Sequence, residues 1–600
     1  MIEKKNKLIR VADYVMEYLH TNGVDHVFMV TGRGALFLTD AVAKHKELES
    51  ISVHHEQSAA YAAVAYADYT GKPGACLVST GCAGTNAITG VLNAWQDGIP
   101  CVFISGQNKL QETTRYTGIP IRTYGQQEAD IIPIVESITK HAVMITDPKQ
   151  IVYEMEKALY LAQSGRKGPV WIDIPLDVQN MRIIPSELEH YIIENEIKYE
   201  PLAEDIDYIL DALSKAKRPV ILIGSGIRSA EAIEEFQDFI EKNQIPVTYS
   251  GSATDTYADN NSLSIGSVGI MGCTRAGNFT VQNSDLLLVL GSRLSSMTTG
   301  PEINKFAREA KIIIVDIDPI EHSKSCLNID RLIIADVKKL INVLRTKSID
   351  GVNQKWLDKC QHWKDIFPRC EEEYKSSEEV DLYQLAESLS NVMPKESVFI
   401  SDSGMIELVL PTNINFKKEQ RSIHPASQGS MGFALPGIIG AYFASNQIPV
   451  CVVGDGSIMM NLQELATIKY NNIPAKIFVV NNNAYAVIRK RMDELFRRSI
   501  GTDGENGVGI PDFKKISEGF EIPYVKIETS LNLKKQLQSV IEMEGPVLCE
   551  IMGIENQNYI SSGHARNSKG AIVSRPLEDQ TPYMDRDLFL SEMIVNPIDQ

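Results

Sequence analysis

The sequence lacks the features that mark membrane and secreted proteins. No stretch approaches the ~20 uncharged apolar residues needed to cross a bilayer. The opening MIEKKNKLIRVADY has a basic cluster without the apolar segment of a secretory signal. Nine cysteines are present without a C-x-x-C pair. Most, such as Cys101 and Cys451, lie in apolar runs, so we expect buried free thiols in a cytoplasmic protein.

Positive charge is also scarce. The 59 Lys and Arg residues are outnumbered by 77 Asp and Glu residues, and the net charge is −18. This balance argues against a broad nucleic-acid surface, which needs clustered cations. The hydrophobic fraction of 44% and the charged fraction of 23% are typical of globular proteins. At about 150 residues per domain, a length of 600 residues predicts three to four domains.

Short β-branched runs alternate with helix-length stretches along the whole chain. Continuous apolar strands separated by helices predict parallel sheets covered on both faces, and therefore an α/β class of doubly wound domains. The clearest predicted strands cover residues 75–80, 101–105, 169–175, 219–224, 285–291, 311–317, 450–456 and 476–482.

Two polar, charge-rich stretches, 183–205 and 350–380, are predicted to be linkers. They divide the chain into three blocks, which we place at residues 1–185, 186–365 and 366–600, the last with a C-terminal tail.

The two outer blocks end alike. Gly168-Pro169-Val170 and Gly545-Pro546-Val547 each lead into a predicted strand. This echo suggests two related domains flanking a different middle one, although a single shared heptapeptide is also compatible with coincidence.

The most specific motif is Gly454-Asp455-Gly456-Ser457, which follows a predicted strand and precedes a helix-like segment. The glycines let the backbone approach a phosphate, and a following helix N-terminus would offer free N–H groups. Asp455 supplies a hard oxygen ligand, and Asn482 at the end of the next strand can supply another. Mg²⁺ prefers such oxygens, so this frame predicts a metal-bound diphosphate rather than a plain turn.

The GDGS motif with Asn-Asn 27 residues on resembles the thiamine-diphosphate motif of the acetolactate synthase and pyruvate oxidase superfamily. The similarity covers nearly the whole chain. It implies a pyrimidine-binding first domain, a middle domain that often carries FAD, and a diphosphate-binding third domain. It also implies Mg²⁺ held by Asp455, Asn482 and the carbonyl of Ala484. The remaining residues expected around the diphosphate are Ser403, Gly404, Met405, Gly429, Met431, Gly454, Gly456 and Ser457.

The first block contains His54-His55-Glu56-Gln57-Ser58 before a helix of small residues. A Glu at such a place is usually an N-terminal charge favoured by the helix dipole. The resemblance implies instead that Glu56 bonds N1′ of the cofactor's aminopyrimidine and promotes proton transfer there. It also implies catalytic positions for Gln127 and Gly34, and active sites shared between subunits of a homodimer or homotetramer.

In the middle block, Gly224-x-Gly226 after a predicted strand is half of a dinucleotide fingerprint, which alone is a weak signal. The resemblance to the FAD-binding region of acetolactate synthases strengthens it. The expected flavin residues are Arg166, Gly224, Gly226, Gly291, Arg293, Asp316 and Asp336.

Three positions depart from the acetolactate synthase pattern. Met297 stands where an Arg holds the second keto acid, Arg491 where a Trp shapes the same pocket, and Leu176 where a Lys is usual. Replacing Arg by Met removes a bidentate carboxylate anchor. We therefore expect the donor half of the reaction to be kept and the acceptor pocket to be rebuilt.

Together these features predict a carboligase, of the transferase or lyase class, that decarboxylates a 2-keto acid such as pyruvate. It would add the two-carbon unit to a carbonyl acceptor. The altered pocket and the flavin-type middle domain resemble those of acetolactate-synthase-like enzymes that act on keto-sugar nucleotides, so the resemblance implies such an acceptor. The alternative is a true acetolactate synthase with a second pyruvate as acceptor.

Two other classes of protein fit the sequence less well. A nicotinamide oxidoreductase should have a third glycine where Ser229 stands. A non-catalytic scaffold would leave Glu56, Asp455 and Asn482 unexplained.

Overall fold

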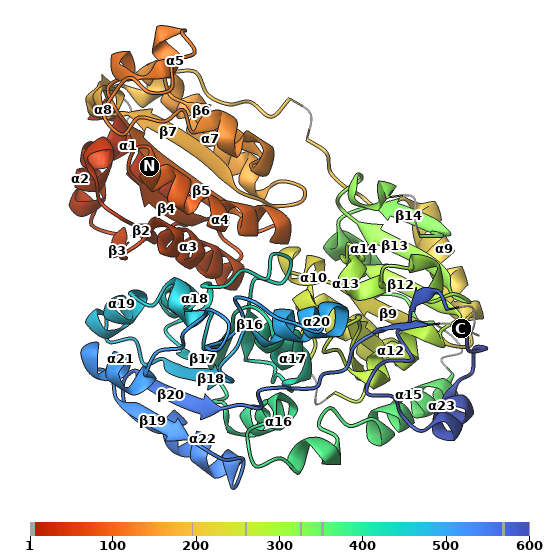
Figure 1. Ribbon diagram of the computed structural model, residues 1–600. Helices are drawn as coiled ribbons and strands as arrows, with labels where there is room; N and C mark the ends of the chain where they lie inside the picture. The colour runs from red at the N-terminus through yellow and green to blue at the C-terminus, as the bar shows by residue number, and fades with distance from the viewer. Residues whose placement is uncertain are drawn as a thin grey trace.

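The computed structural model describes residues 7–194, 196–258, 261–324, 327–349, 353–566 and 570–598. Three six-stranded parallel sheets, each with helices on both faces, follow one another along the chain (Figure 1). The predicted α/β class is confirmed, and all eight runs singled out in the sequence form strands. No helix in the described ranges is long and apolar enough to span a membrane.

The first sheet has the strand order β3-β2-β4-β5-β7-β6. A two-stranded antiparallel pair, β1 (Ile9–Arg10) and β8 (Arg182–Ile183), lies beside it. The strands of the sheet are β2 (His26–Met29), β3 (Glu49–Ser52), β4 (Gly74–Val78), β5 (Cys101–Gln107), β6 (His141–Met144) and β7 (Val170–Pro175). The helices are α1 (Val11–Thr21), α2 (Leu36–Lys44), α3 (Glu56–Thr70), α4 (Cys82–Asp97), α5 (Thr114–Thr117), α6 (Ile132–Val135), α7 (Ile151–Gln163) and α8 (Leu176–Asn180).

The middle sheet has a different order, β11-β10-β9-β12-β13-β14. Counted along the chain, this is 3-2-1-4-5-6, the order of dinucleotide-binding α/β domains. Its strands are β9 (Pro219–Ile223), β10 (Val247–Tyr249), β11 (Ser264–Ser267), β12 (Leu286–Leu290), β13 (Lys311–Asp316) and β14 (Arg331–Ile334). Its helices are α9 (Ala203–Lys215), α10 (Gly226–Ser229), α11 (Ile233–Asn243), α12 (Arg275–Gln282), α13 (Ser296–Thr299), α14 (Val337–Leu344) and α15 (Gln354–Ile366).

The third sheet runs β16-β15-β17-β18-β20-β19. Its strands are β15 (Ser397–Ser401), β16 (Arg421–Ile423), β17 (Ile448–Gly454), β18 (Lys476–Asn481), β19 (Tyr524–Ile527) and β20 (Val547–Met552). Its helices are α16 (Leu382–Val392), α17 (Met405–Asn413), α18 (Ala434–Ser445), α19 (Glu464–Tyr470), α20 (Ala486–Phe496), α21 (Phe513–Gly519) and α22 (Leu533–Ile541). The tail adds β21 (His564–Arg566), β22 (Ile572–Ser574) and α23 (Arg586–Glu592).

The first and third sheets share one topology. Counted within each domain, both have the strand order 2-1-3-4-6-5, and the two Gly-Pro-Val segments begin the same sixth strand, β7 and β20. Because the middle sheet differs, the expectation of two related domains around an unlike one agrees with the topology.

Helices α3 and α18 join the two related domains. Every residue of α3 from Ser58 to Ala67 is buried, and one hydrophobic core combines residues of both domains, from Phe28 to Leu548. The helices lie so close that a Cβ on Gly440 would stand 2.1 Å from the carbonyl oxygen of Ala62. Each helix follows the second strand of its own domain, so equivalent elements face each other.

One predicted linker was partly wrong. Within 350–380, residues Gln354–Ile366 form α15, and Trp356 and Trp363 are buried against the middle sheet. Apolar side chains recur at helical spacing there, a pattern that the many charges between them obscured.

The C-terminal tail leaves the third domain and packs on the middle one. Phe589 joins the core of the middle domain, while the carboxylate of Glu592 accepts from Lys359 and from the indole N–H of Trp363. Of the described cysteines all but Cys82 are buried, and all are free thiols.

Candidate active site at the carboxyl ends of the strands

Asp455 and Asn482 meet at the carboxyl ends of neighbouring strands β17 and β18. Asp455 is 2% exposed, and its carboxylate accepts N–H bonds from Gly456 at 2.7 Å and from Asn482 at 3.1 Å. Burial raises the pKa of Asp455 to about 6, against the opposing effect of these bonds. A bound cation would reverse that shift, because an opposite charge stabilises the ionised carboxylate.

A cavity of about 250 Å³ opens over this turn. It brings together most of the residues predicted for the diphosphate and the metal: Ser403, Gly404, Met405, Met431, Gly454, Asp455, Gly456, Ser457, Asn482 and Ala484. Gly429 does not line the cavity, but its φ of +57° makes the turn that precedes Met431.

Two glycines of this site are required by different constraints. A Cβ on Gly456 would collide with the ring of Tyr485 at 1.9 Å, so the close approach of the loop demands glycine. Gly404 has open space around it but a φ of +74°, which favours glycine for conformational reasons.

The predicted helix start after the glycines was too early. A short 3₁₀ turn, Ile458–Met460, follows the motif, and α19 begins only at Glu464. The N–H groups nearest the turn therefore belong to the loop and not to a long helix.

Asp402, which the sequence did not single out, connects two turns of this site through hydrogen bonds. Its fully buried carboxylate accepts N–H bonds from Ser403 at 2.7 Å, from Gly432 at 3.1 Å and from Ala434, the first residue of α18, at 3.1 Å. It thus ties the turn at Gly404 to the turn at Met431. An Asp directly after a strand is common in ordinary structural turns. Its link between the two turns of this site is therefore visible only in the fold.

Glu56 lies at the carboxyl edge of the first sheet, as the first residue of α3. The side chain of His55 caps the helix by accepting from the Gln57 N–H at 3.2 Å. The Glu56 carboxylate accepts from the side-chain amide of Asn86 on α4 at 2.9 Å. This contact holds the carboxylate at the edge and was not predicted.

Gly34 and Gln127 lie at the same edge. A Cβ on Gly34 would stand 1.7 Å from Thr80 Oγ1, so only glycine fits there. Gln127 has a φ of +62°, unusual for a residue with a side chain, and its carbonyl packs where Gly81 leaves room. Strained backbone of this kind is found at functional sites.

A second, larger cavity of about 1,440 Å³ lies between the first and middle domains and extends to the third. Ordinary small-ligand pockets measure about 300–1,000 Å³, so this one has room for a dinucleotide. Six of the seven residues predicted for FAD line it: Arg166, Gly226, Gly291, Arg293, Asp316 and Asp336.

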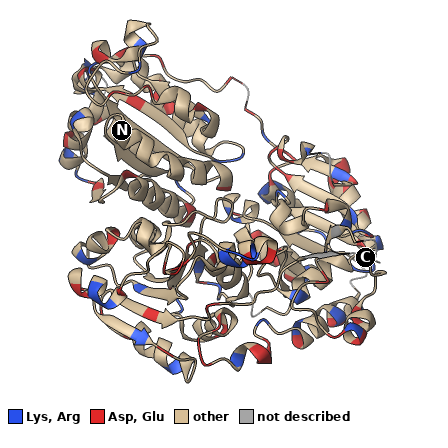
Figure 2. Ribbon diagram, in the orientation of Figure 1, with Lys and Arg blue, Asp and Glu red and all other residues tan. Residues whose placement is uncertain are grey.

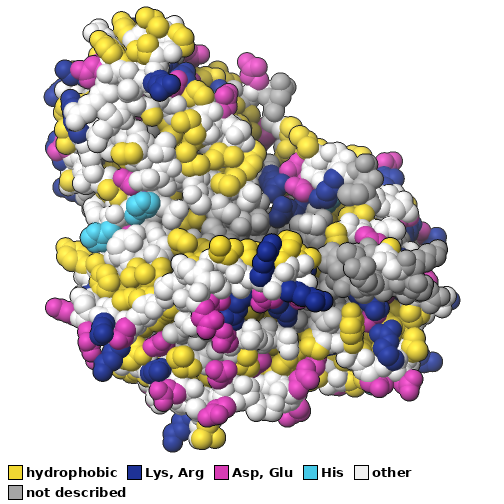
Figure 3. Space-filling view, viewed as in Figure 1, with side chains coloured by type: hydrophobic (Ala, Val, Ile, Leu, Met, Phe, Trp, Pro, Cys, Tyr) yellow, Lys and Arg dark blue, Asp and Glu magenta, His cyan; other side chains and the backbone are white. Residues whose placement is uncertain are grey.

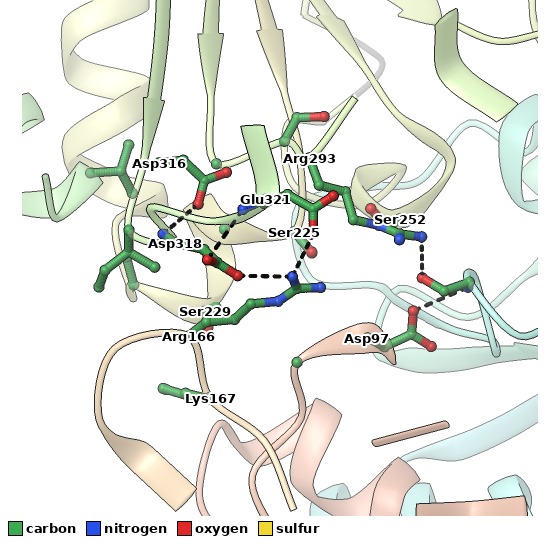
Figure 4. Close-up of a pocket in the computed structure, with 18 of the residues that line it drawn as sticks. Asp97, Arg166, Lys167, Ser225, Ser229, Ser252, Arg293, Asp316, Asp318 and Glu321 are labelled. Atoms are coloured by element: carbon green, nitrogen blue, oxygen red, sulfur yellow. Dashed lines mark hydrogen bonds and ion pairs between the residues drawn. The ribbon is translucent and has the colours of Figure 1, made fainter. Parts of the chain in front are cut away.

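Polar side chains converge on this larger cavity (Figure 4). Arg166 points at Asp318 and Glu321, with nitrogen–oxygen distances of 3.1 and 2.7 Å. Arg293 donates to the hydroxyl of Ser427 in the third domain at 2.7 Å. The cavity is therefore built from all three domains.

Gly224 does not line the cavity, and the half fingerprint has a packing explanation. A Cβ on Gly224 would meet the Gly291 carbonyl at 2.3 Å, and one on Gly226 would meet the Gly291 Cα at 2.6 Å. Both glycines let the ends of β9 and β12 touch.

Of the three altered acceptor positions, Met297 lines the large cavity, whereas Leu176 and Arg491 line neither of the two cavities described above. Met297 is 43% exposed and lines the large cavity. Arg491 lies on α20, 3.4 Å from Glu494. Leu176 begins α8, and its N–H donates to the Asn108 carbonyl at 3.2 Å.

Three family models match the chain in order. They are the N-terminal thiamine pyrophosphate binding domain over residues 9–134, the central domain over 206–344 and the C-terminal thiamine pyrophosphate binding domain over 402–551 of thiamine pyrophosphate enzymes.

The chain belongs to the thiamine-pyrophosphate-dependent enzymes of the acetolactate synthase type. It is 30% identical to acetolactate synthase large subunit of Haemophilus influenzae, over 96% of this chain and all of that protein. It is 31% identical to the large subunit of Cyanidium caldarium, over 92% and 95% of the two chains. Acetolactate synthase 1 of Zea mays is 30% identical over 92% and 86%.

Proposed function

We propose that this chain uses thiamine diphosphate and Mg²⁺ to decarboxylate a 2-keto acid, with pyruvate as the expected donor. The remaining two-carbon unit is joined to a carbonyl acceptor. The observation that carries the proposal is the buried turn at Asp455 beside Asn482. Hard oxygen ligands next to glycine turns suit a metal-bound diphosphate.

The residues fit the metal. Asp455 would supply a carboxylate oxygen, Asn482 its amide oxygen and Ala484 its carbonyl, and Mg²⁺ takes its remaining ligands from phosphate and water. All three line the cavity of about 250 Å³. The raised pKa of Asp455 also fits, since a charge without its counter-ion is destabilised by burial.

Thiamine diphosphate, when bound, supplies the nucleophilic carbon and the electron sink for loss of CO₂. Glu56 would hold and move the proton at N1′ of its aminopyrimidine. Asn86 orients the Glu56 carboxylate through the 2.9 Å hydrogen bond. Gly34 and Gln127, at the same edge, would border the reacting carbon.

We propose that the active site is completed by a second copy of the chain, in a homodimer or homotetramer. The small cavity is lined only by residues from 380 to 557, and Glu56 is not among them. Large hydrophobic side chains near both edges are exposed in the single chain. Leu36 and Tyr124, near Glu56 in the first domain, are 54% and 61% exposed. Ile488 and Phe496, on α20 beside the small cavity, are 46% and 64% exposed. Hydrophobic side chains also gather on the surface where the first and third domains meet (Figure 3). Exposed apolar patches of this kind are expected of an interface.

We also propose FAD as the occupant of the large cavity. The 3-2-1-4-5-6 strand order and the converging polar side chains support it. Arg166, Gly226, Gly291, Arg293, Asp316 and Asp336 would hold it, with Gly224 acting through the packing of β9. A yellow purified protein with flavin absorbance would support this assignment, and a colourless one would count against it.

For the acceptor, the relatives favour a second 2-keto acid, because those named above are acetolactate synthases. A second candidate rests on Met297, which replaces the expected arginine by an uncharged side chain exposed in the large cavity. That change favours an acceptor without a carboxylate, such as a keto-sugar nucleotide. Arg491 would have to reach the carboxylate for the first candidate to hold.

The test is a product assay by mass spectrometry with pyruvate, thiamine diphosphate and Mg²⁺, with and without keto-sugar acceptors. Vigorous acetolactate formation from pyruvate alone would establish the acetolactate synthase reaction and reject the rebuilt acceptor site. Products only with an added acceptor would support the second candidate. Absence of CO₂ release from every 2-keto acid tried would reject the proposed function.

A further inference from the structure

Asn461 lies between the 3₁₀ turn Ile458–Met460 and α19, and it is 1% exposed. Its amide oxygen accepts from Ser58 Oγ at 3.1 Å and from Gln463 Nε2 at 3.1 Å. Its amide nitrogen donates to Gln57 Oε1 at 3.0 Å and to the Gly432 carbonyl at 2.7 Å. A primary amide has two donors and two acceptor sites, so every one of them is used.

These hydrogen-bond partners lie next to residues of the proposed active site in both the first and the third domain. Gln57 and Ser58 directly follow Glu56 in the first turn of α3, and Gly432 directly follows Met431. Glu464, fully buried, accepts from the His54 N–H at 3.1 Å on the other side of Glu56. One segment of the third domain thus holds the Glu56 turn from two sides.

We propose that Asn461 is a positioning residue that fixes the Glu56 turn relative to the cofactor turn at Met431. Resting on the proposed function, this inference also links active sites. Each chain gives Glu56 to one site and the Met431 turn to the other, so Asn461 joins the two sites of a dimer. Buried and fully bonded, its amide cannot shift at one turn without breaking a bond at the other.

The sharpest variant is Asn461→Asp, which keeps the shape but turns both donors into acceptors facing Gln57 Oε1 and the Gly432 carbonyl. Two readouts are needed on the cofactor-loaded protein. One is the rate of hydrogen–deuterium exchange at C2 of bound thiamine diphosphate, and the other is the affinity for the cofactor. Both should fall about tenfold or more, since leaving buried polar groups unpaired costs enough free energy for that factor.

Asn471→Ala is the matched control. Within the described residues its side-chain amide donates to the Thr467 carbonyl of its own helical turn and to no other group. Exchange and affinity should therefore stay within about twofold of the wild type. If Asn461→Asp does not fold, Gln57→Ala removes one of the same bonds and should slow exchange in the same direction.

The outcomes distinguish failure of the positioning role of Asn461 from failure of the proposed function. Exchange in Asn461→Asp within twofold of the wild type at saturating cofactor would overturn the positioning role and leave the proposed function intact. Exchange absent from the wild type itself would overturn the proposed function and this inference together. A double-mutant cycle between Asn461→Ala and Ser58→Ala should be clearly non-additive, and additivity would overturn the direct link.

Discussion

Glu56 and Asp455 are carboxylates at the ends of strands in related domains, yet their surroundings differ. Asp455 is buried and accepts backbone N–H bonds, whereas Glu56 is half-buried and accepts from one side-chain amide. The first environment suits a metal ligand held in a fixed position, and the second suits the proton transfer that the proposed function assigns to Glu56. Substitutions at the two positions should therefore affect different measurements.

Glu56→Gln keeps the size of the side chain and removes its ability to exchange a proton. We expect CO₂ release to fall at least about 100-fold, within the range of general acid–base contributions, with cofactor affinity nearly unchanged. Calorimetric titration with thiamine diphosphate and Mg²⁺ beside the rate assay checks both. An active variant would contradict the role given to Glu56.

Asp455→Ala should instead weaken binding of the Mg²⁺–diphosphate unit and leave the empty protein at least as stable, because burial makes this charge costly. Titration and thermal unfolding of the cofactor-free protein test the two parts. Unchanged affinity would argue against Asp455 as a metal ligand.

Asp173 gives a prediction for pH. It is fully buried in β7, accepts from Ser105 at 2.7 Å and from Gln107 at 3.2 Å, and burial raises the pKa of its carboxyl to about 7. Between about pH 4 and pH 7 the folded protein keeps a proton that the unfolded chain has already lost, so this group's stabilisation is lost as pH rises towards 7. Relative to Asp173→Asn, the wild type should lose up to about 1.4 kcal/mol per pH unit between pH 5 and 7 in urea unfolding. A constant difference would contradict this.

At the residue scale, the sequence was sufficient where a motif fixed the position within an element. Asp455 and Asn482 meet as expected because consecutive parallel strands end at one edge of the sheet. Asn461 and Asp402 were missed because their partners, Ser58 and Gly432, come from elsewhere in the chain. Nothing local distinguishes such residues from ordinary polar ones.

At the scale of elements, the strands were predictable because continuous apolar runs are typical of doubly covered parallel sheets. Strand order was not, since it depends on which helices pack across which sheet. The small-residue helix α3 shows the difference. Its composition was plain in the sequence, but its burial against α18 appears only in the fold.

Gly440 tests that packing. In Gly440→Leu the side chain would begin 2.1 Å from the Ala62 carbonyl, and we expect a loss of about 3 kcal/mol or more in the free energy of unfolding, at the upper end of overpacking effects. Gly519→Ala is the control, because its Cβ would enter open space. Equal stability of the two variants would show that α3 and α18 can separate freely.

For the whole molecule, charges of both signs are interspersed over all three domains (Figure 2), in keeping with a small-molecule enzyme.

The third predicted block includes the tail, yet the tail packs on the middle domain. That contact was not predictable from the sequence. Apolar residues such as Phe589 indicate that the tail is buried against something, but they do not indicate which domain it packs on.

Mixing inactive variants tests whether chains share active sites. A mixed dimer of Glu56→Gln and Asp455→Ala chains has one site with both native residues, if each site draws on two chains. Co-refolded equal amounts should then recover about a quarter of wild-type activity, since half of the dimers are mixed and one site in two is intact. If both residues of a site come from one chain, activity will not return.

The match of strand order between the outer domains, with α3 against α18, gives the chain the plan of two copies of one ancestral domain facing each other. The segment between the second strand and the following helix brings Glu56 to the start of α3 in the first domain and holds the Met431 turn before α18 in the third. The loop after the third strand holds Gly81 in the first domain and Asp455 in the third. If the proposed function holds, such a duplication would have divided the chemistry, with one domain supplying the proton transfer and the other binding the phosphates.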